Sequence, residues 1–364
     1  MRTKTLAYIL LSVSAAGGCG ESAKMPAMPW QKPPALPTAP PTHVMGAQGT
    51  VTSADPVPGT PAGDAEQVRR RLVARQFDQA YAEGQAALRK YAGDETVRED
   101  LLLWIGEAEL GRKNYYEAYE GFEKLLNDYP DGRYRGRALS REYEVADKFL
   151  LGAKRTTMKV FRVSAKDEAI KILEGIADHA PNTAIAAKAL LRIGDYYYAD
   201  KKYADSVAAY DRFLQLFPKA PLAGYATYQA AQASRAMYIG VLYDESPLRD
   251  ALQRFRDYQQ SFPAQAREQQ VEGQIVAIRT MLAEKTYTVG QYYEKTRPSL
   301  ERKRAAAYYY QRTMREFPTT IWAQRARLNL SRLGVPPPAS PGLPAPNLYL
   351  ETQRDAQKEG RDPE

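Results

Sequence analysis

Two stretches of this chain repeat one spacing of glycine, aromatic residues and proline, and this repeat restricts the fold more than any other feature. Gly194 is followed by Pro218 after 24 residues, and Gly106 is followed by Pro130 after the same interval. Between these ends, aromatic and small residues recur every three or four positions: Tyr203, Ser206, Tyr210 and Phe213 in one stretch, Tyr115, Ala118 and Phe122 in the other. That recurrence is the period of an amphipathic helix, glycine permits close helix approach, and proline ends the second helix. The sequence therefore predicts repeated helix pairs.

The pattern resembles the tetratricopeptide repeat, in which helix pairs stack on their neighbours. We expect an all-α solenoid of about six helix pairs over residues 64–334, with Asp64 as the first N-cap and a long helix at 264–295. A capping helix follows at 319–333, ended by Gly334. The basic, β-branched stretch 153–164 is predicted to be a loop inserted within the third pair; a helix extension is the alternative.

Proline marks both ends of this folded body. Ten of the 25 prolines lie in residues 26–61 and six in residues 336–346. Segments of this kind do not bury a core, so we expect residues 19–63 to form a flexible tether and residues 335–364 a disordered tail. One folded domain lies between them.

Residues 1–18 have the composition of a secretory signal peptide: Arg2 and Lys4 precede a short apolar run. The sequence Ala16-Gly17-Gly18-Cys19 resembles the bacterial lipobox, although Ala16 stands where leucine is usual. The resemblance implies lipidation of Cys19 and, because Gly20 rather than aspartate follows, sorting to the periplasmic face of the outer membrane. An ordinary signal peptide is the alternative. Cys19 is the only cysteine, which excludes internal disulfides and thiolate metal clusters.

From about residue 200 to 334 the chain resembles the BamD family of the outer-membrane β-barrel assembly machinery. The resemblance rests on the run AAYDRFLQLFPKAPLAGYATYQAAQA, on Tyr243-Asp244 to Pro263, and on Leu282-Ala283, Tyr287, Val289 and Tyr292-Tyr293. It implies a non-enzymatic scaffold that binds a barrel-bearing outer-membrane protein through its C-terminal repeats and unfolded outer-membrane protein segments through its N-terminal ones. The candidate partner-binding residues are Tyr292, Tyr293, Arg302 and Arg304. Tyr308-Tyr309 stands where relatives tend to carry a basic residue, so a salt bridge there is not carried over.

The chain has 26 tyrosines, including the run Tyr196, Tyr197 and Tyr198. Three consecutive helical residues point in three directions, so at least one ring of the run should face a groove or solvent. Tyrosine offers apolar area and a hydroxyl at small entropic cost, which suits a peptide-binding groove. Packing between helices is the alternative for these rings.

The net charge of +8 includes clusters at residues 69–71, 133–141, 154–155 and 302–304. We expect these clusters to be solvated helix faces, with anionic lipid head groups or an acidic partner as the alternative. Nucleic acid is not an expected partner for an exported lipoprotein.

Catalytic signals are few. His43 lies in the predicted tether and His179 near a helix end, where it can cap carbonyls and meet the helix dipole. Phosphate-binding loops, dinucleotide fingerprints and metalloprotease motifs do not occur, so we expect no catalytic residue, cofactor or metal. Two alternatives stay open: a lipoprotein that coordinates cell-wall synthesis or envelope constriction, and an envelope enzyme with an unrecognised carboxylate pair.

Overall fold

The computed structural model describes residues 42–45, 51–54, 57–157, 161–296 and 299–338. It contains two compact units, Met1–Pro56 and Val57–Glu364. The predicted signal peptide, the lipobox with Cys19, and the tail beyond residue 338 lie outside the described residues.

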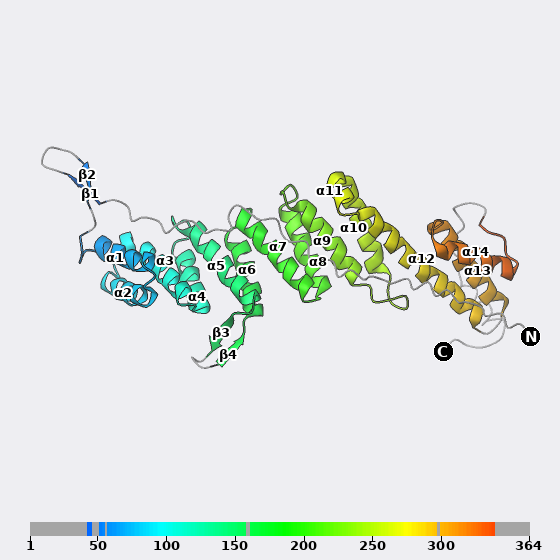
Figure 1. The fold of residues 1–364 in the computed structure, drawn as a ribbon, viewed down its shortest axis with the longest axis horizontal. Coiled ribbons are helices and arrows are strands. Elements are labelled where there is room, and N and C mark those ends of the chain that lie inside the picture. The colour runs from blue at the N-terminus through cyan, green and yellow to red at the C-terminus, as the bar shows by residue number, and fades with distance from the viewer. Residues whose placement is uncertain (1–41, 46–50, 55–56, 158–160, 297–298, 339–364) are drawn as a thin grey trace, which may run out of the picture. The chain divides into compact units, whose positions relative to one another are not determined.

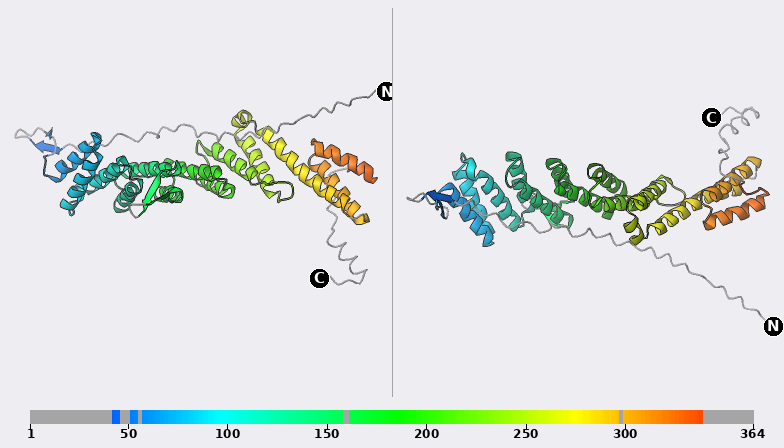
Figure 2. Two further views of the ribbon diagram at one scale, coloured as in Figure 1. Left: turned by 60° about the horizontal axis from the view of Figure 1, so that its bottom comes forward. Right: turned by 90° about the horizontal axis from the view of Figure 1, so that it is seen from above.

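The second unit is the predicted solenoid, and its helices stack in chain order (Figures 1 and 2). Its six helix pairs are α1 (Pro61–Val73) with α2 (Phe77–Lys90), α3 (Glu95–Gly111) with α4 (Tyr115–Asp128), α5 (Arg135–Leu150) with α6 (Lys166–His179), α7 (Ala184–Ala199) with α8 (Tyr203–Leu216), α9 (Ala223–Ala236) with α10 (Ser246–Ser261), and α12 (Val271–Lys295) with α13 (Leu300–Glu316). The short helix α11 (Pro263–Glu268) precedes the sixth pair, and α14 (Ile321–Leu333) is the cap. The predicted all-α solenoid of six pairs and a capping helix is confirmed.

Glycine sets the close contact inside three of these pairs. A Cβ atom on Gly106 would lie 2.6 Å from the Phe122 ring, and one on Gly194 would lie 2.6 Å from the Tyr210 ring. The sixth pair repeats this contact, with 2.8 Å between such an atom on Gly290 and the ring of Tyr310. A side chain at these positions would force the helices apart, which explains the glycines in the sequence repeat.

Helix ends follow the expected chemistry with one correction. The first N-cap is Thr60, whose hydroxyl accepts from Gly63 N, and not Asp64. Pro61 supplies a preset φ at the first helical position, so α1 begins before Asp64. At the other end Gly334 closes α14 with φ 71°, as predicted.

The predicted helix over 264–295 is wrong in one respect, because it is broken between α11 and α12. Gln270 adopts a left-handed conformation with φ 52°. Ala266 and Val271 are both buried, yet a separation of five residues would place them on different faces of one continuous helix. The break brings both to the core, and Val271, Ile275, Ile278 and Leu282 then continue on one face of α12.

The insertion lies between α5 and α6, as predicted, but it is not a loop: its described residues form two antiparallel strands, β3 (Lys154–Thr157) and β4 (Phe161–Ser164). A second pair of antiparallel strands, β1 (Thr42–Met45) and β2 (Val51–Ala54), lies in the segment predicted to be a flexible tether. β-branched residues in both strands favour extended backbone, a local signal that the proline content of the segment obscured.

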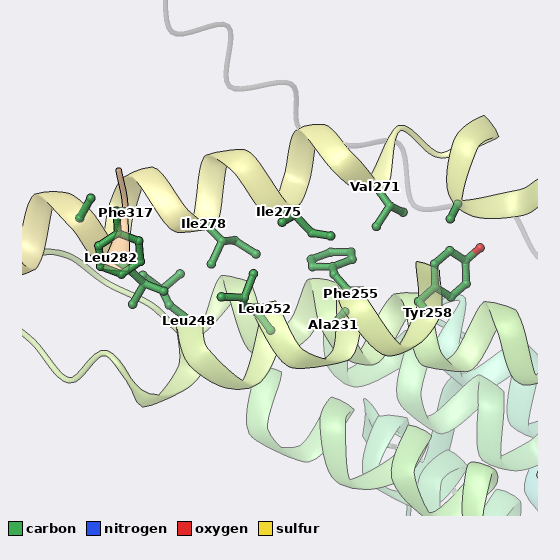
Figure 3. Close-up of a cluster of buried hydrophobic side chains, with 13 residues drawn as sticks. Ala231, Leu248, Leu252, Phe255, Tyr258, Val271, Ile275, Ile278, Leu282 and Phe317 are labelled. Carbon is green, nitrogen blue, oxygen red and sulfur yellow. The ribbon is translucent and has the colours of Figure 1, made fainter. Parts of the chain in front are cut away.

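Buried aromatic and aliphatic side chains of α10 pack with buried aliphatic side chains of α12 in one core cluster (Figure 3). Phe255 lies at its centre and is fully buried, and the Tyr228 ring of α9 meets it edge-on at 5.9 Å. Phe317, between α13 and α14, joins the same cluster. The cluster thus fixes the fifth pair to the sixth.

Ala118 of α4 is fully buried, so a larger side chain at this position tests the assigned packing of the second helix pair. We expect Ala118→Leu to lower the free energy of unfolding by about 1–3 kcal/mol through overpacking. Thermal melts should show this loss, while Glu120→Leu, at an exposed position of the same helix, should change little. An unchanged melt for Ala118→Leu would contradict the assigned packing.

Candidate functional site

A buried ion-pair network joins helix α3 of the second pair to helix α5 of the third pair. Glu107 of α3 accepts from Arg137 Nε at 2.7 Å and from Arg141 Nη2 at 2.8 Å, both from α5. Glu99 and Asp100 pair similarly with Arg133. The cluster at 133–141 was expected to be solvated. Arg137 and Arg141 are instead largely buried and paired, which removes them from any free basic surface.

A second polar network links the fourth and fifth pairs. The hydroxyls of Tyr210 and Tyr225 both donate to Asp195 Oδ1 at 2.6 Å. Burial raises the pKa of Asp195, although the two hydroxyls and Arg192 favour its charged form. Arg192 itself donates to Asp147 of α5 at 2.9 Å. These contacts fix the relative rotation of neighbouring pairs, and a sequence alone does not reveal them.

The candidate groove residues Tyr196, Tyr197 and Tyr198 are all partly exposed on α7 and point in different directions. The Tyr196 and Tyr197 rings are 5.6 Å apart. Lys166 lies 6.0 Å from the Tyr196 ring. Tyr198 instead contacts Tyr203 at 5.6 Å, on the side of α8. The first two tyrosines therefore form one small surface, and Tyr198 does not belong to it.

At the C-terminal end, four tyrosines form a continuous array, which we call the tyrosine array: Tyr292, Tyr293, Tyr308 and Tyr309. Tyr293 of α12 stacks on Tyr309 of α13 with 5.6 Å between ring centroids and an interplanar angle of 7°. Tyr292 meets Tyr293 edge-on at 5.6 Å, and Tyr308 meets Tyr309 at 5.3 Å. Tyr292 is 61% exposed, so the array ends in a ring that faces solvent.

One ion pair joins α13, which carries Tyr308 and Tyr309, to the fifth pair. Arg249 of α10 lies 2.7 Å from Glu245 and 3.6 Å from Glu316 of α13. Arg312, one turn before Glu316, pairs with it at 2.7 Å. The array is therefore carried by helices that are fixed to one another and is not part of a loose end.

The two candidate arginines have different environments. Arg302 donates to Thr296 Oγ1 at 2.6 Å and closes the connection between α12 and α13, so its guanidinium is already engaged. Arg304 is exposed, with no ion pair within the described part of the chain, and lies one turn before Tyr308 on α13. Arg304 is thus the better candidate to accompany the tyrosine array.

A polar hollow of about 550 Å³ lies at the N-terminal end, between the turns of the first two pairs. Phe77, Asp78, Gly111 and Arg112 are among its lining residues. Arg112 donates to Asp78 at 2.8 Å and to Glu109 at 3.0 Å, so its charge is neutralised inside the hollow. Sequence reasoning did not identify this feature.

Glu142 is the most deeply buried carboxyl group of α5, with 1% of its surface exposed. Burial and the nearby Glu123 raise the pKa of Glu142 well above its usual value. His179, expected to cap carbonyls, instead places Nε2 at 3.0 Å from Glu123 Oε1. Within the described residues, no group of three or more histidine, cysteine or acidic side chains could hold a metal ion.

A raised pKa means that the folded state binds the Glu142 proton more tightly than the unfolded state does. This contribution to stability is complete below the unfolded pKa and is lost as pH rises through the folded pKa. We therefore expect Glu142→Gln, which cannot ionise, to gain stability relative to the unmodified protein as pH rises from about 5 to about 8. Denaturant titrations at both pH values measure this. An equal difference at both values, or the same trend in the exposed Glu120→Gln, would contradict it.

None of the described helices is both long and apolar enough to cross a bilayer. Residues 153–332 match a family described as outer membrane lipoprotein, and residues 100–132 match the tetratricopeptide repeat. These matches cover the helices from α6 to α13 with most of the cap, and most of the second pair.

Among curated proteins, the chain is similar to outer membrane protein assembly factor BamD of Caulobacter vibrioides, with 26% identity over 134 residues. The alignment covers 37% of this chain and 44% of that protein, less than half of the relative's length. Similar solved structures include the C-terminal part of a repeat protein from Cytophaga hutchinsonii, with 14% identity, a TM-score of 0.37, and coverage of 74% of this chain and 88% of that one. A tetratricopeptide repeat protein from Parabacteroides merdae has 12% identity, a TM-score of 0.34, and coverage of 75% and 92%.

Proposed function

This chain is a BamD-like tetratricopeptide-repeat protein, and on that premise we propose that it is a non-enzymatic scaffold for the assembly and insertion of outer-membrane β-barrel proteins. The observation that carries the proposal is the match of residues 153–332 to the outer membrane lipoprotein family. That range holds every residue of the tyrosine array.

The tyrosine array and Arg304 are the proposed contact for a barrel-bearing outer-membrane protein. Aromatic and arginine side chains dominate the energetics of protein interfaces, and both are present here on fixed helices. Tyr292 and Tyr293 supply exposed and half-exposed ring area on the sixth pair, after which α14 is the last helix among the described residues. Arg302 supports this surface by closing the connection between α12 and α13.

Unfolded outer-membrane protein segments are the proposed ligands of the earlier repeats. The candidate positions are Tyr196 and Tyr197, whose rings form one surface with Lys166 and Lys202 nearby. Tyr198 is the weaker candidate because it packs toward α8. Such a surface suits an extended peptide, since rings contact side chains of many kinds and lysines attract carboxylates.

Attachment through a lipid on Cys19 is the proposed means of localisation to the periplasmic face of the outer membrane. Replacing the lipidated cysteine removes the acyl chains, so we expect Cys19→Ser to move the protein from the membrane to the soluble fraction after a high-salt wash. Fractionation and immunoblotting measure this. If the salt-washed variant stays in the membrane fraction with its signal peptide removed, the lipid is not the anchor.

The proposed function can be tested by depleting this protein from cells. A barrel-assembly scaffold predicts that folded β-barrel proteins decline in the outer membrane while their unfolded forms accumulate in the periplasm. Quantitative proteomics of both fractions measures this. A defect confined to cell-wall synthesis or constriction, with normal barrel proteins, would support the envelope-coordinating alternative instead.

A further inference from the structure

Because neighbouring helices run in opposite directions, the connections between them fall on two edges of the solenoid. The first edge comprises the described residues of the connections inside the six pairs: 74–76, 112–114, 151–157, 161–165, 200–202, 237–245, 296 and 299. The second edge comprises the connections between pairs: 91–94, 129–134, 180–183, 217–222, 262–270 and 317–320. In Figure 1 the β3–β4 hairpin and the α9–α10 connection both lie on the lower side, as members of one edge.

The two edges differ in charge. The described residues of the first edge include eight lysines and arginines and three acidic residues, a net charge of +5. The second edge contains three basic and three acidic residues, a net charge of zero. The chain as a whole carries +8. Of the two edges, only the first therefore carries a net positive charge over its described residues.

Three lysines of the first edge are open to a partner. Lys113, Lys154 and Lys201 are exposed, and none of them forms an ion pair with another residue that the structure describes. They belong to the second, third and fourth pairs, so the free charge is spread along the solenoid. This contrasts with Arg137 and Arg141 of α5, which both pair with Glu107, while Arg141 also pairs with Glu144.

The first edge also exposes apolar side chains. Leu151 is 71% exposed, Ile239 is 70% exposed and Leu242 is 85% exposed. Further exposed apolar residues lie within this edge or next to it: Val73, Met237, Tyr243 and Leu300. Beside the connections of the second edge, the described residues include only two such side chains, Leu216 and Ile321.

Contacts with α12 and with the core cluster fix the connection between α9 and α10, in which apolar side chains are exposed. Lys285 of α12 donates to the carbonyl oxygens of Val241, at 3.0 Å, and Tyr243. Tyr238 packs on the core cluster, which anchors the start of the connection. Ile239 and Leu242 lie between these anchors, so their exposure belongs to a fixed loop.

We propose that the first edge of the solenoid lies against the surface of an anionic phospholipid bilayer, with Lys113, Lys154 and Lys201 near the phosphates and Ile239 and Leu242 at the acyl boundary. Basic residues with interspersed apolar side chains are the chemistry of interfacial membrane binding. The three lysines lie on three different connections, and Ile239 and Leu242 lie together on a fourth, so the charged and apolar groups are spread over four repeats. A lipid surface engages such separated residues together.

Sedimentation with vesicles tests the proposal on the full chain carrying Cys19→Ser and purified after signal removal, so that no acyl chain contributes. The vesicles contain phosphatidylethanolamine and phosphatidylglycerol in about a three-to-one ratio, with phosphatidylcholine vesicles for comparison. The edge variant combines Lys113→Glu, Lys154→Glu and Lys201→Glu. We expect it to bind anionic vesicles about a hundredfold more weakly, at about fivefold for each lysine removed from the surface.

The matched control combines Lys219→Glu, Arg256→Glu and Arg327→Glu, three exposed positions outside the first edge with the same total change in charge. It should keep most of the binding. A second comparison removes apolar contact alone: Ile239→Ser with Leu242→Ser should weaken binding about tenfold, while Leu216→Ser with Leu328→Ser should not.

Equal loss in the edge and control variants would show that net charge alone drives binding and would overturn the proposal. So would tight binding of the unmodified chain to phosphatidylcholine alone, or no binding to anionic vesicles. Loss of a co-purifying acidic protein from the edge variant, with vesicle binding unchanged, would assign this edge to a protein partner instead. The vesicle experiment does not depend on barrel assembly. The role in barrel assembly is tested independently by depleting the protein from cells.

Discussion

Replacing Phe255 with alanine is expected to lower the free energy of unfolding by about 3–5 kcal/mol, because the change leaves a large cavity in a well-packed core. Phe255 is fully buried between α10 and α12 and contacts the Tyr228 ring of α9. Figure 3 shows it facing Ile275 of α12. Val276→Ala is the control: Val276 lies next to Ile275 on α12 and is 54% exposed, so this change should alter stability by less than about 0.5 kcal/mol.

The location of this loss distinguishes a solenoid from a fold with one global core. Each unit of a solenoid contacts only its neighbours, so α9–α14 should lose amide protection in Phe255→Ala while α3 and α5 keep theirs. Hydrogen exchange with mass spectrometry measures protection helix by helix. Uniform loss of protection along the chain would contradict the repeat architecture.

The second large effect is expected at the tyrosine array. Tyr292→Ala combined with Arg304→Glu should weaken binding of the barrel-bearing partner by at least about thirtyfold, since truncating one interface anchor costs about 2 kcal/mol. Both side chains are exposed and Arg304 has no ion pair in the described chain, so the fold should be preserved. Tyr293 is less suitable because its ring supports Tyr309.

A matched variant controls for general loss of aromatic and basic surface. Tyr243→Ala with Arg256→Glu removes a ring that is 57% exposed and reverses an exposed charge outside the array. It should retain the partner in affinity purification, with unchanged circular dichroism. If both variants lose the partner equally, the array is not the specific contact.

The repeat architecture could be predicted because its signals are local. The spacing from Gly194 to Tyr210 equals that from Gly106 to Phe122, and both pairs make the same close contact in the structure. The sixth pair has four more residues between Gly290 and Tyr310 and keeps the contact. This spacing follows from helix packing, so the second, fourth and sixth pairs could be identified from it, and helical periodicity between them indicated the others.

The break before α12 was missed although its signal is also local. Ala266 and Val271 are five residues apart, which no continuous helix places on one face. The prediction of one continuous helix over residues 264–295 did not take into account the spacing of the apolar residues along it. The left-handed Gln270 resolves that conflict.

The polar networks could not be predicted, because their partners are far apart in sequence. Glu107 lies 30 residues from Arg137 and 34 from Arg141. A run of arginines looks like a solvated surface until the neighbouring helix supplies its carboxylates. The hydrogen bond from Arg302 to Thr296 spans only six residues, but it forms across the turn between α12 and α13, and it changes the role of Arg302 from contact to support.

One measurement tests the central claim, the role in barrel assembly, most directly. A photo-crosslinking amino acid placed at Tyr292 in the native, membrane-attached protein reports which protein touches the exposed end of the array. We expect a crosslinked product whose partner peptides, identified by mass spectrometry, come from a β-barrel-bearing outer-membrane protein. The same label at Leu216, 47% exposed on the second edge, should not give this product. Crosslinks at Tyr292 to cell-wall-binding or constriction proteins, with no barrel protein among them, would contradict the account.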